Sequence, residues 1–292
     1  MADRVSATGA ENPRAVLAEL EQRAKKRFGQ HFLARPSVCE RMVRAARVAP
    51  GDRVLEIGPG LGLLTEALVA AGAEVTAIEI DPTLAVRLAE RLPQVRVVRA
   101  DATRADWDEL LPGGGWKVVA NLPYNVGTGL VMDLLRSGRV ASITAMLQAE
   151  VVGRMVAGAG DELYGALSVE VALRASGSVV ASVPPEAFVP PPKVHSLVVH
   201  LVAHEVAASD GLDPAEVDRV VRAAFAQRRK TVRNSLAGTF GTPRTAEALA
   251  ATGVDPGARA EVLDRAAFVA LAWALAERDG CASNPPESPT SG

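Results

Sequence analysis

The segment 53–62 constrains the fold of this chain most, because a short apolar stretch leads directly into the glycine-rich sequence GPGLG. Arg53–Ile57 has the sequence RVLEI, which is typical of a buried parallel strand, and good helix formers follow over Leu61–Ala71. Glycines between a strand and a helix let the backbone turn tightly and approach a ligand closely. The free N–H groups at the start of the helix can then face that ligand. We therefore expect a ligand-binding loop of an α/β fold.

The alternation of strands and helices continues beyond this loop. Further strands are expected at residues 74–80, 95–99, 117–120, 140–147, 179–183 and 197–202, and helices at 82–92, 128–136, 149–156 and 166–175. This alternation predicts a doubly wound, mostly parallel sheet. Too few residues separate the last two strands for a crossover helix, so we expect the last strand to be antiparallel.

After His204 the pattern changes from strands to helices. Residues 205–212 are small and polar, as in a linker, and helices are expected at 215–226, 230–237, 244–251 and 264–276. We expect a flexible N-terminal extension over residues 1–24, the α/β domain over 25–204, a small all-helical domain over 213–279, and a disordered tail over 280–292.

Several sequence features favour a cytoplasmic protein. Residues 1–12 are polar and lack the apolar core of a signal peptide, and no run of 18 apolar residues would form a membrane-spanning helix. The two cysteines, Cys39 and Cys281, lie far apart without metal-type or redox spacing. Such a pattern fits a reducing compartment.

The formal net charge of −2 argues mildly against a nucleic-acid partner, but the charge is unevenly distributed. Basic residues without intervening acids occupy two segments: Arg23, Lys25, Lys26, Arg27 and Arg35 in the first, and Arg222, Arg228, Arg229, Lys230, Arg233 and Arg244 in the second. Such patches are either solvated surfaces or sites for a phosphate backbone. Within the second segment, we consider Arg228, Arg229, Lys230 and Arg233 the best candidates for RNA contacts.

Carboxylates follow the next two expected strands. Glu79 lies about 20 residues beyond the glycine loop, where a carboxylate can accept from both ribose hydroxyls of a cofactor. Asp101 follows the strand at 95–99 and could accept from a cofactor adenine or cap a helix. The loop lacks the third glycine spacing of the dinucleotide fingerprint. These features leave open a nicotinamide cofactor, S-adenosylmethionine, or a purely structural turn.

The tetrapeptide Asn121-Leu122-Pro123-Tyr124 follows the fourth expected strand and indicates the chemistry. The amino nitrogen of adenine is a poor nucleophile, because its lone pair is delocalised into the ring. Two acceptors for its N–H groups, the Asn121 side chain and the Leu122 carbonyl held by Pro123, would direct the lone pair at a methyl donor. Tyr124 could stack on a base taken out of its helix. The alternative is a proline turn with a core tyrosine.

No metal centre is expected, because the four histidines (His31, His195, His200 and His204) are scattered along the chain. Methyl transfer from a sulfonium needs neither a metal nor a strong base, so alignment and charge stabilisation should account for catalysis.

Taken together, these motifs resemble the small-subunit (16S) rRNA adenine dimethyltransferase family, also called the dimethyladenosine or kasugamycin-resistance methyltransferases. The resemblance extends from about Lys25 to Leu271. It rests on KKRFGQHFL (25–33), LEIGPGLGLLT (55–65), NLPY (121–124), FVPPPKVHS (188–196), FAQRRKTVRNSL (225–236) and RAEVLDRAAFVALA (259–272). The proline-rich and QRRKT segments separate it from the related large-subunit erythromycin-resistance enzymes.

The resemblance implies a Rossmann-like class I methyltransferase sheet, with S-adenosylmethionine as the methyl donor. The implied cofactor-binding residues are His31, Leu33, Gly58, Gly60, Glu79, Asp101 and Asn121. Asn121, Leu122, Pro123 and Tyr124 would form the target-adenine pocket, and Phe188 would cover the other face of the base. The implied products are two adjacent dimethylated adenines near the 3′ end of 16S rRNA. The implied enzyme contributes to ribosome biogenesis as a monomer, with no obligate protein partner and no membrane.

Two departures from the family pattern stand out. Where the family usually has Ile-Ser-Thr-Pro, this chain has Val126-Gly127-Thr128-Gly129, and the two glycines predict a softer loop. The glutamine usual after Y-G-x-L-S-V is also absent after Val169. Three alternatives remain: a large-subunit rRNA adenine methyltransferase, an assembly factor on a methyltransferase scaffold, and an NAD oxidoreductase, which NLPY disfavours.

Overall fold

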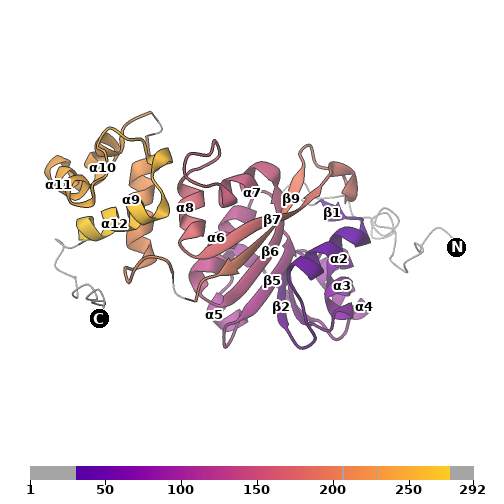
Figure 1. Cartoon of the computed structure of the whole chain (residues 1–292). Coiled ribbons are helices and arrows are strands. Elements are labelled where there is room, and N and C mark those ends of the chain that lie inside the picture. The colour runs from indigo at the N-terminus through magenta and orange to yellow at the C-terminus, as the bar shows by residue number, and fades with distance from the viewer. Residues whose placement is uncertain (1–30, 206, 228, 277–292) are drawn as a thin grey trace, which may run out of the picture. The chain divides into compact units, whose positions relative to one another are not determined.

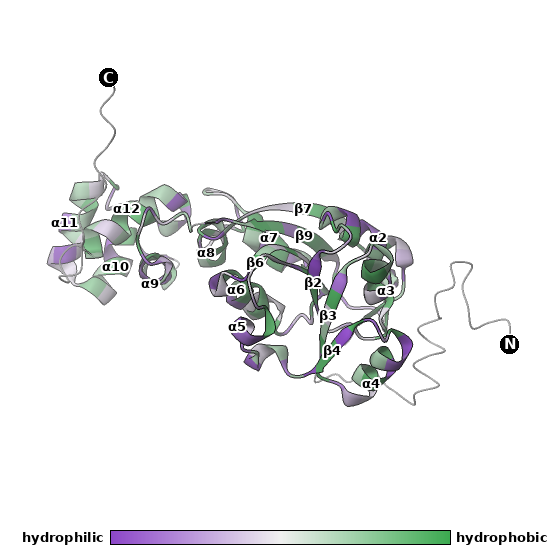
Figure 2. Ribbon diagram, turned by 90° about the horizontal axis from the view of Figure 1, so that it is seen from below, coloured by the Kyte–Doolittle hydropathy of each residue, from purple (hydrophilic) through white to green (hydrophobic). Residues whose placement is uncertain are grey.

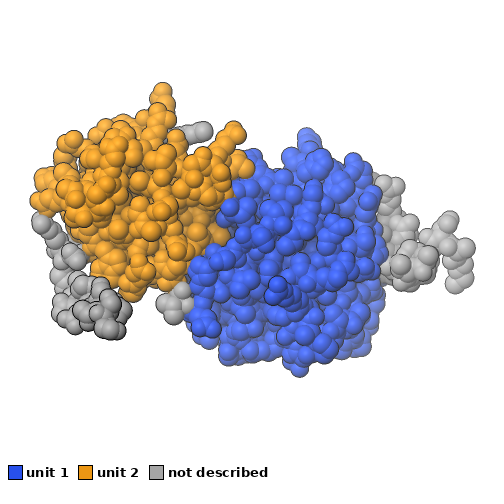
Figure 3. All heavy atoms as spheres, viewed as in Figure 1, with its two compact units in different colours: residues 1–156, 174–205 blue, residues 157–173, 206–292 orange. Residues whose placement is uncertain are grey.

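The computed structural model describes residues 31–205, 207–227 and 229–276, and the chain divides into two compact units (Figure 3). Unit 1 comprises residues 1–156 and 174–205, and unit 2 comprises 157–173 and 206–292. Unit 2 thus includes residues 157–173, which the sequence analysis placed in the α/β domain. The expected extension at 1–24 and the expected tail at 280–292 lie outside the described residues.

A seven-stranded sheet in the order β4-β3-β2-β5-β6-β9-β7 forms the centre of unit 1. Its strands are β2 (Arg53–Ile57), β3 (Glu74–Glu79), β4 (Arg96–Arg99), β5 (Trp116–Asn121), β6 (Val140–Gln148), β7 (Ala175–Val183) and β9 (Ser196–Ala203). The pairs from β4 to β6 are parallel, whereas β9 is antiparallel to both β6 and β7. The expected mostly parallel sheet with an antiparallel last strand is confirmed.

Helices cover both faces of this sheet. On one face lie α2 (Pro36–Ala45), α3 (Leu63–Ala70) and α4 (Pro82–Arg91), and on the other lies α6 (Gly127–Ser137) (Figure 1). The remaining helices of unit 1 are α5 (Trp107–Leu110) and α7 (Ala149–Val156). The strand order runs outward in opposite directions from β2 and β5. Because crossovers between parallel strands are nearly always right-handed, this order puts helices on opposite faces of the sheet. The carboxyl ends of β2 and β5 therefore flank the crevice where open α/β sheets bind ligands.

Local sequence explains why these elements begin and end where they do. Val54 and Leu55 in β2 are completely buried, as expected for a strand covered on both faces. Asp81 caps α4 by accepting from the N–H groups of Thr83 and Leu84, and Pro82 occupies the first turn of that helix. Figure 2 shows apolar residues within β3 and a mixture of polar and apolar residues in outer helices such as α11 (Thr242–Thr252).

A small second sheet joins two distant segments of unit 1. The strands β1 (Phe32–Leu33) and β8 (Phe188–Val189) pair antiparallel, with Phe32 opposite Val189 and Leu33 opposite Phe188. Neither strand was expected from the sequence, and neither was α2. The pairing brings the amino-terminal motif to the proline-rich segment.

The described part of unit 2 is helical. It contains α8 (Ala166–Ala172), α9 (Pro214–Phe225), α10 (Val232–Phe240), α11 and α12 (Arg265–Ala276). These helices have their own hydrophobic core, in which Val221, Leu236 and Phe268 are completely buried. The Tyr164 hydroxyl donates to the Leu263 carbonyl at 2.8 Å. No helix among the described residues has the length and hydropathy needed to cross a membrane.

Candidate active site

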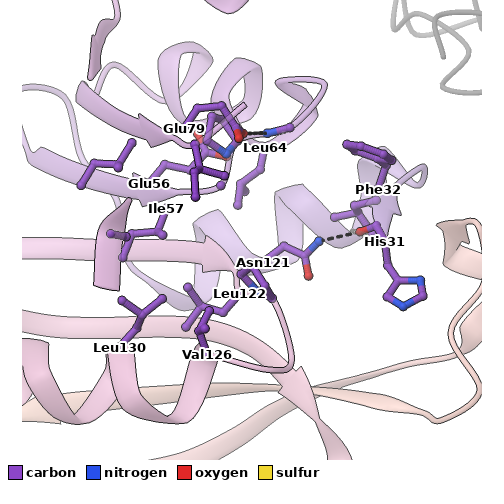
Figure 4. Close-up of a pocket in the computed structure, with 18 of the residues that line it drawn as sticks. His31, Phe32, Glu56, Ile57, Leu64, Glu79, Asn121, Leu122, Val126 and Leu130 are labelled. Carbon is purple, nitrogen blue, oxygen red and sulfur yellow. Dashed lines mark hydrogen bonds between the residues drawn. The ribbon is translucent and has the colours of Figure 1, made fainter. Parts of the chain in front are cut away.

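A cavity of about 350 Å³ in unit 1 lies at the carboxyl ends of the central strands (Figure 4). Ten of the predicted site residues line it: His31, Leu33, Gly58, Gly60, Glu79, Asp101, Asn121, Leu122, Pro123 and Tyr124. They come from β1 and the residue before it, from the loops after β2 and β4, from the end of β3, and from the end of β5 and the residues that follow it. The volume falls within the usual range for cofactor sites. The fold therefore brings together segments that are up to about ninety residues apart in the sequence.

The glycine loop presents its backbone to this cavity. Gly58 and Gly60 have φ values of +67° and +56°, which residues other than glycine rarely adopt. A Cβ atom on Gly58 would meet nothing within 4 Å, so the position opens onto free space. A Cβ atom on Gly60 would lie 3.0 Å from the Phe32 ring. A ligand can therefore approach the backbone at Gly58 more closely than any side chain there would permit.

Glu79 connects this loop to the end of β3. Its side chain is only 4% exposed. Its Oε2 accepts from the Gly60 N–H at 3.2 Å, and its Oε1 accepts from the Asp81 N–H at 2.9 Å. Burial raises the pKa of the carboxyl, and these hydrogen bonds oppose the rise. Each carboxylate oxygen has a second lone pair, so Glu79 can still accept ribose hydroxyls.

Asp101 is a cap and also a cavity residue. It begins the 3₁₀ turn Ala102–Arg104, and its Oδ1 accepts from the Thr103 N–H at 3.0 Å and the Thr103 hydroxyl at 2.7 Å. The Thr103 hydroxyl is the main cause of the lowered pKa of Asp101. No described residue donates to Oδ2, which leaves that oxygen for a ligand.

The side-chain amide of Asn121 has a defined orientation. Its Nδ2 donates to the backbone carbonyl of His31 at 3.1 Å. Because a carbonyl oxygen can only accept, the nitrogen of the amide must face His31. Figure 4 shows the amide oxygen of Asn121 turned away from this hydrogen bond. The oxygen is therefore available as an acceptor at the cavity.

The backbone after Asn121 is fastened on both sides of the Leu122 carbonyl. The Leu122 N–H donates to the Met146 carbonyl on β6 at 3.2 Å. The Pro123 carbonyl accepts from the N–H groups of Val126 and Gly127 at 3.2 and 2.8 Å, in the first turn of α6. No described group donates to the carbonyl of Leu122 itself. The Asn121 amide oxygen and the Leu122 carbonyl oxygen thus accept no hydrogen bond from a described residue. These are the two oxygens that the sequence analysis predicted as acceptors for an adenine amino group.

A comparison with known proteins assigns the chain to a family. The family model described as Ribosomal RNA adenine dimethylase matches residues 21–277. The chain belongs to this family. As a member, it is an rRNA methyltransferase that uses S-adenosylmethionine.

Individual relatives and solved structures agree with this assignment. The Pseudomonas putida protein named Ribosomal RNA small subunit methyltransferase A is 43% identical over 266 residues, covering 89% of this chain and 98% of the relative. The Methylococcus capsulatus protein of the same name is 44% identical over 255 residues, covering 86% of this chain and 97% of the relative. A dimethyladenosine transferase from Plasmodium falciparum superposes with a TM-score of 0.72 at 27% identity, covering 82% of this chain and 96% of that structure. The 23S rRNA methyltransferase ErmE superposes with a TM-score of 0.66 at 27% identity, covering 84% of this chain and 99% of ErmE.

Phe188 differs from the other predicted site residues of this dimethylase. It does not line the cavity, and its side chain is 2% exposed in the hydrophobic core of unit 1, which also includes Leu33, its partner in the β1–β8 pair. To cover a face of the target base, as the sequence analysis expected, the ring would have to turn out of this core. That role remains a prediction.

Glu56 is a cavity residue to which the sequence analysis gave no role. It lies on β2, is 1% exposed and lines the cavity, and no described residue hydrogen-bonds to its Oε2. Burial is the main cause that raises its pKa to about 8, and the neighbouring Glu79 adds to the rise. Thr65 on α3 acts in the opposite direction, but its buried hydroxyl does not reach hydrogen-bond geometry. The sequence did contain a signal for this role, because Glu56 lies within the expected buried strand. A fully buried carboxylate is rare unless it is paired or has a function.

The two unusual glycines of this dimethylase belong to a helix and not to a soft loop. Gly127 and Gly129 lie in the first turn of α6. Gly127 is buried, and a Cβ atom there would lie 2.3 Å from Leu147 Cδ2 and 3.2 Å from Leu122 Cβ. A Cβ on Gly129 would meet nothing within 4 Å. The expectation of a softer loop is wrong, because close packing of Gly127 against Leu147 anchors this turn.

The predicted RNA-binding residues divide according to their partners. In unit 2, Arg229, Lys230 and Arg233 are exposed near the start of α10 and form no ion pair with a described residue. Arg228 lies outside the described residues. Arg222 instead pairs with Glu170 at 3.0 Å and Asp218 at 3.8 Å, and Arg244 donates to the Leu275 carbonyl. Three cations of the basic segment are therefore free for an external anion.

Two of the histidines hydrogen-bond to neighbouring hydroxyls. His200 Nδ1 lies 2.8 Å from the Thr144 hydroxyl, and His204 Nε2 lies 3.0 Å from the Ser176 hydroxyl. Across residues 31–205, 207–227 and 229–276, no group of three or more potential ligands could hold a metal ion.

Proposed function

We propose that this enzyme transfers methyl groups from S-adenosylmethionine to the exocyclic amino groups of two adjacent adenines near the 3′ end of 16S rRNA, giving N6,N6-dimethyladenosine. The observation that carries the proposal is the pair of unused acceptors, the Asn121 amide oxygen and the Leu122 carbonyl, beside the cavity. For the first methyl transfer, a nitrogen that donates both N–H groups to these oxygens has its lone pair directed out of the adenine ring plane. The methylated nitrogen then releases one proton to solvent and keeps one N–H group for the second transfer.

The cavity suits the methyl donor, which supplies an activated methyl group on a positively charged sulfur. Gly58 leaves room for close approach, and Glu79 can accept from both ribose hydroxyls. Asp101 has a free oxygen for the cofactor's adenine amino group. Glu56 adds a buried carboxyl whose Oε2 has no hydrogen-bond partner among the described residues, and a cationic ligand would stabilise its charged form.

The residues of this chain would act mainly by alignment. Tyr124 lines the cavity next to Asn121 and offers a ring on which the extruded adenine can stack, a contact worth about 1–3 kcal/mol. Pro123 restricts the backbone that holds the Leu122 carbonyl. Fixed acceptors and a fixed stacking surface lower the barrier without reorganising during the reaction.

The names of the relatives support a small-subunit substrate. Proteins named for small-subunit methylation are 43–44% identical to this chain over nearly their whole length, whereas ErmE, named for 23S rRNA, is 27% identical. We infer that 16S rRNA within the small ribosomal subunit is the partner, that the protein acts as a monomer, and that it works in the cytoplasm. We further infer that unit 2 binds the RNA or subunit through Arg229, Lys230 and Arg233, together with Arg228.

A methylation assay with labelled S-adenosylmethionine tests this choice of substrate. Small subunits, large subunits and free 16S rRNA, all lacking adenine dimethylation, are incubated with the enzyme in parallel. We expect label in the RNA of the small subunit and none in that of the large subunit. Label in 23S rRNA alone would instead support the large-subunit alternative.

A further inference from the structure

Ser196 lies at the start of β9, where the sheet fixes its position on both sides. It pairs with Gln148 on β6 and with Val183 on β7. Just before it, the His195 carbonyl accepts from the Ala149 N–H at 3.0 Å. The side chain of Ser196 is completely buried. Its hydroxyl therefore occupies a defined point in unit 1, and it does not line the cofactor cavity.

The hydroxyl of Tyr124 is joined to this point. The oxygens of Tyr124 and Ser196 are 2.6 Å apart, which is a short hydrogen bond between two hydroxyls. Burial raises the pKa of Tyr124 above its usual value, so the phenol remains a neutral O–H group at physiological pH. No other hydrogen-bond partner of the Tyr124 hydroxyl occurs among the described residues.

The backbone at Tyr124 is already held, so the hydrogen bond acts on the ring. The hydrogen bonds that the Leu122 N–H donates and the Pro123 carbonyl accepts hold the backbone just before Tyr124, but they leave the side-chain torsions of Tyr124 free. The His31 ring lies 5.5 Å from the Tyr124 ring at an angle of 31° and limits one side. The Ser196 hydrogen bond holds the phenol oxygen at the far end of the ring, so that the direction in which the ring extends from the backbone is fixed.

We infer that Ser196 is a positioning residue, which holds the Tyr124 ring at the place where the target adenine stacks on it. This inference rests on the proposed function, because the stacked adenine is part of that function. Ser196 itself is completely buried and does not line the cofactor cavity. Its loss should therefore lower the rate of methyl transfer, whereas affinity for S-adenosylmethionine should change little.

A double-mutant cycle separates this role from a general structural one. The variants are Ser196→Ala, Tyr124→Phe and the double variant, with Ser142→Ala on β6 as a matched loss of a buried serine hydroxyl. We expect kcat on small subunits to fall on the order of fivefold in Ser196→Ala, the effect of one neutral hydrogen bond. Tyr124→Phe and the double variant should show the same fall, and Ser142→Ala should show none. An equal further fall when Ser196→Ala is added to Tyr124→Phe would overturn the inference.

A second measurement needs no RNA, so it judges the hydrogen bond even if the proposed function fails. The chain has two tyrosines, Tyr124 and Tyr164, so NMR of protein with ¹³C-labelled tyrosine rings gives two sets of signals. Tyr124→Phe assigns them, and Tyr164 serves as the internal reference. We expect Ser196→Ala to shift the Tyr124 signals, with the Tyr164 signals unchanged. Unchanged Tyr124 signals in the folded variant would overturn the inference, whereas an inactive wild-type enzyme with a shifted Tyr124 would contradict only the proposed function.

Discussion

Asn121 and His31 are joined by a hydrogen bond of 3.1 Å, in which the side-chain amide nitrogen of Asn121 donates to the backbone carbonyl oxygen of His31. The bond links the end of β5 to the segment just before β1, which are far apart in the sequence. Because a carbonyl oxygen can only accept, the bond uses one N–H of the amide and leaves the amide oxygen for a substrate. The amino-terminal motif thereby determines the orientation of the Asn121 amide in the target-adenine pocket.

Replacing Asn121 with Ala should reduce methyl transfer much more than RNA affinity. The variant loses one acceptor at the reacting nitrogen, whereas RNA affinity is spread over many phosphate contacts. We expect kcat to fall on the order of 10²-fold, as when one preorganised group is removed from an active site. Single-turnover rates at saturating S-adenosylmethionine and filter binding of small subunits measure the two quantities. Equal losses of rate and affinity would show that Asn121 only positions the RNA.

Glu79→Ala should weaken S-adenosylmethionine binding on the order of 10²-fold, because two hydroxyls lose a charged acceptor. Glu79→Gln should weaken binding nearly as much, since the new amide nitrogen would face the N–H of either Gly60 or Asp81. Glu74→Ala, at the exposed first position of the same strand, is the matched control and should bind normally. Titration calorimetry with each folded variant measures the affinity. An unchanged affinity in Glu79→Ala would remove Glu79 from the site.

The buried carboxyl of Glu56 should make the stability of the ligand-free enzyme depend on pH. Its pKa of about 8 in the folded protein exceeds the ordinary value of 4.5, so the folded state holds an extra proton between these values. The titratable groups that affect it, Glu79 and Cys39, interact with it unfavourably when they are charged. Stability from Glu56 should therefore be complete below about pH 4.5 and be lost as the pH rises to about 8.

Glu56→Gln should remove this dependence. At pH 9 we expect the variant to melt about 3 °C or more above the wild type, since roughly 1 kcal/mol shifts the Tm of a domain of this size by about 2–4 °C. At pH 5 the two proteins should melt much closer together. Melting curves from pH 5 to 9 without cofactor give the comparison. Parallel curves over the whole range would contradict the raised pKa.

The two glycines of α6 should respond oppositely to alanine. Gly127→Ala places a methyl group 2.3 Å from Leu147 Cδ2, and such overpacking should cost about 1–3 kcal/mol of stability. Gly129→Ala enters open space in a helix and should be neutral or stabilise the fold by about 0.5–1 kcal/mol. Because the methyl group at residue 127 also presses on Leu122, kcat should fall in that variant alone. Urea unfolding and the methylation assay test both statements, and equal stability of the two variants would refute the packing argument.

Neutralising Arg229, Lys230 and Arg233 with glutamine should weaken binding to the small subunit and flatten its salt dependence. Each lost phosphate contact removes about 0.7–0.9 from the slope of log K against log salt concentration. A control variant removes the same charge from three exposed cations of unit 1, Arg41, Arg96 and Arg99. The affinity across a salt series is measured for both folded variants. If both variants lower the slope equally, general charge rather than this segment binds the RNA.

The sequence predicted those features that depend on local patterns. The strand Arg53–Ile57 is confirmed with its bounds, because apolar residues end directly at glycines. The carboxyl ends of parallel strands meet in one crevice, and so the fold also explains why Glu79, Asp101 and Asn121 line the same cavity. The first half of β7 was missed, because its residues 175–178 are small and largely exposed on an edge strand, without apolar alternation.

Other features depend on contacts between distant segments, which local patterns do not show. The strands β1 and β8 have two residues each, too few for any periodicity, and yet they place Phe188 in the core. The packing of Gly127 against Leu147 joins α6 to β6, so that a glycine expected to soften a loop instead fits a tight contact. The hydrogen bond between Tyr124 and Ser196 likewise spans 72 residues of sequence.

Mapping the methylated nucleosides tests the central claim most directly. Small subunits lacking adenine dimethylation are treated with the enzyme, and their 16S rRNA is analysed by nucleoside mass spectrometry and primer extension. We predict N6,N6-dimethyladenosine at two adjacent positions near the 3′ end with the wild type, and a strongly reduced amount with Asn121→Ala. Methyl groups on another atom or another base, or an undiminished product with Asn121→Ala, would contradict the account.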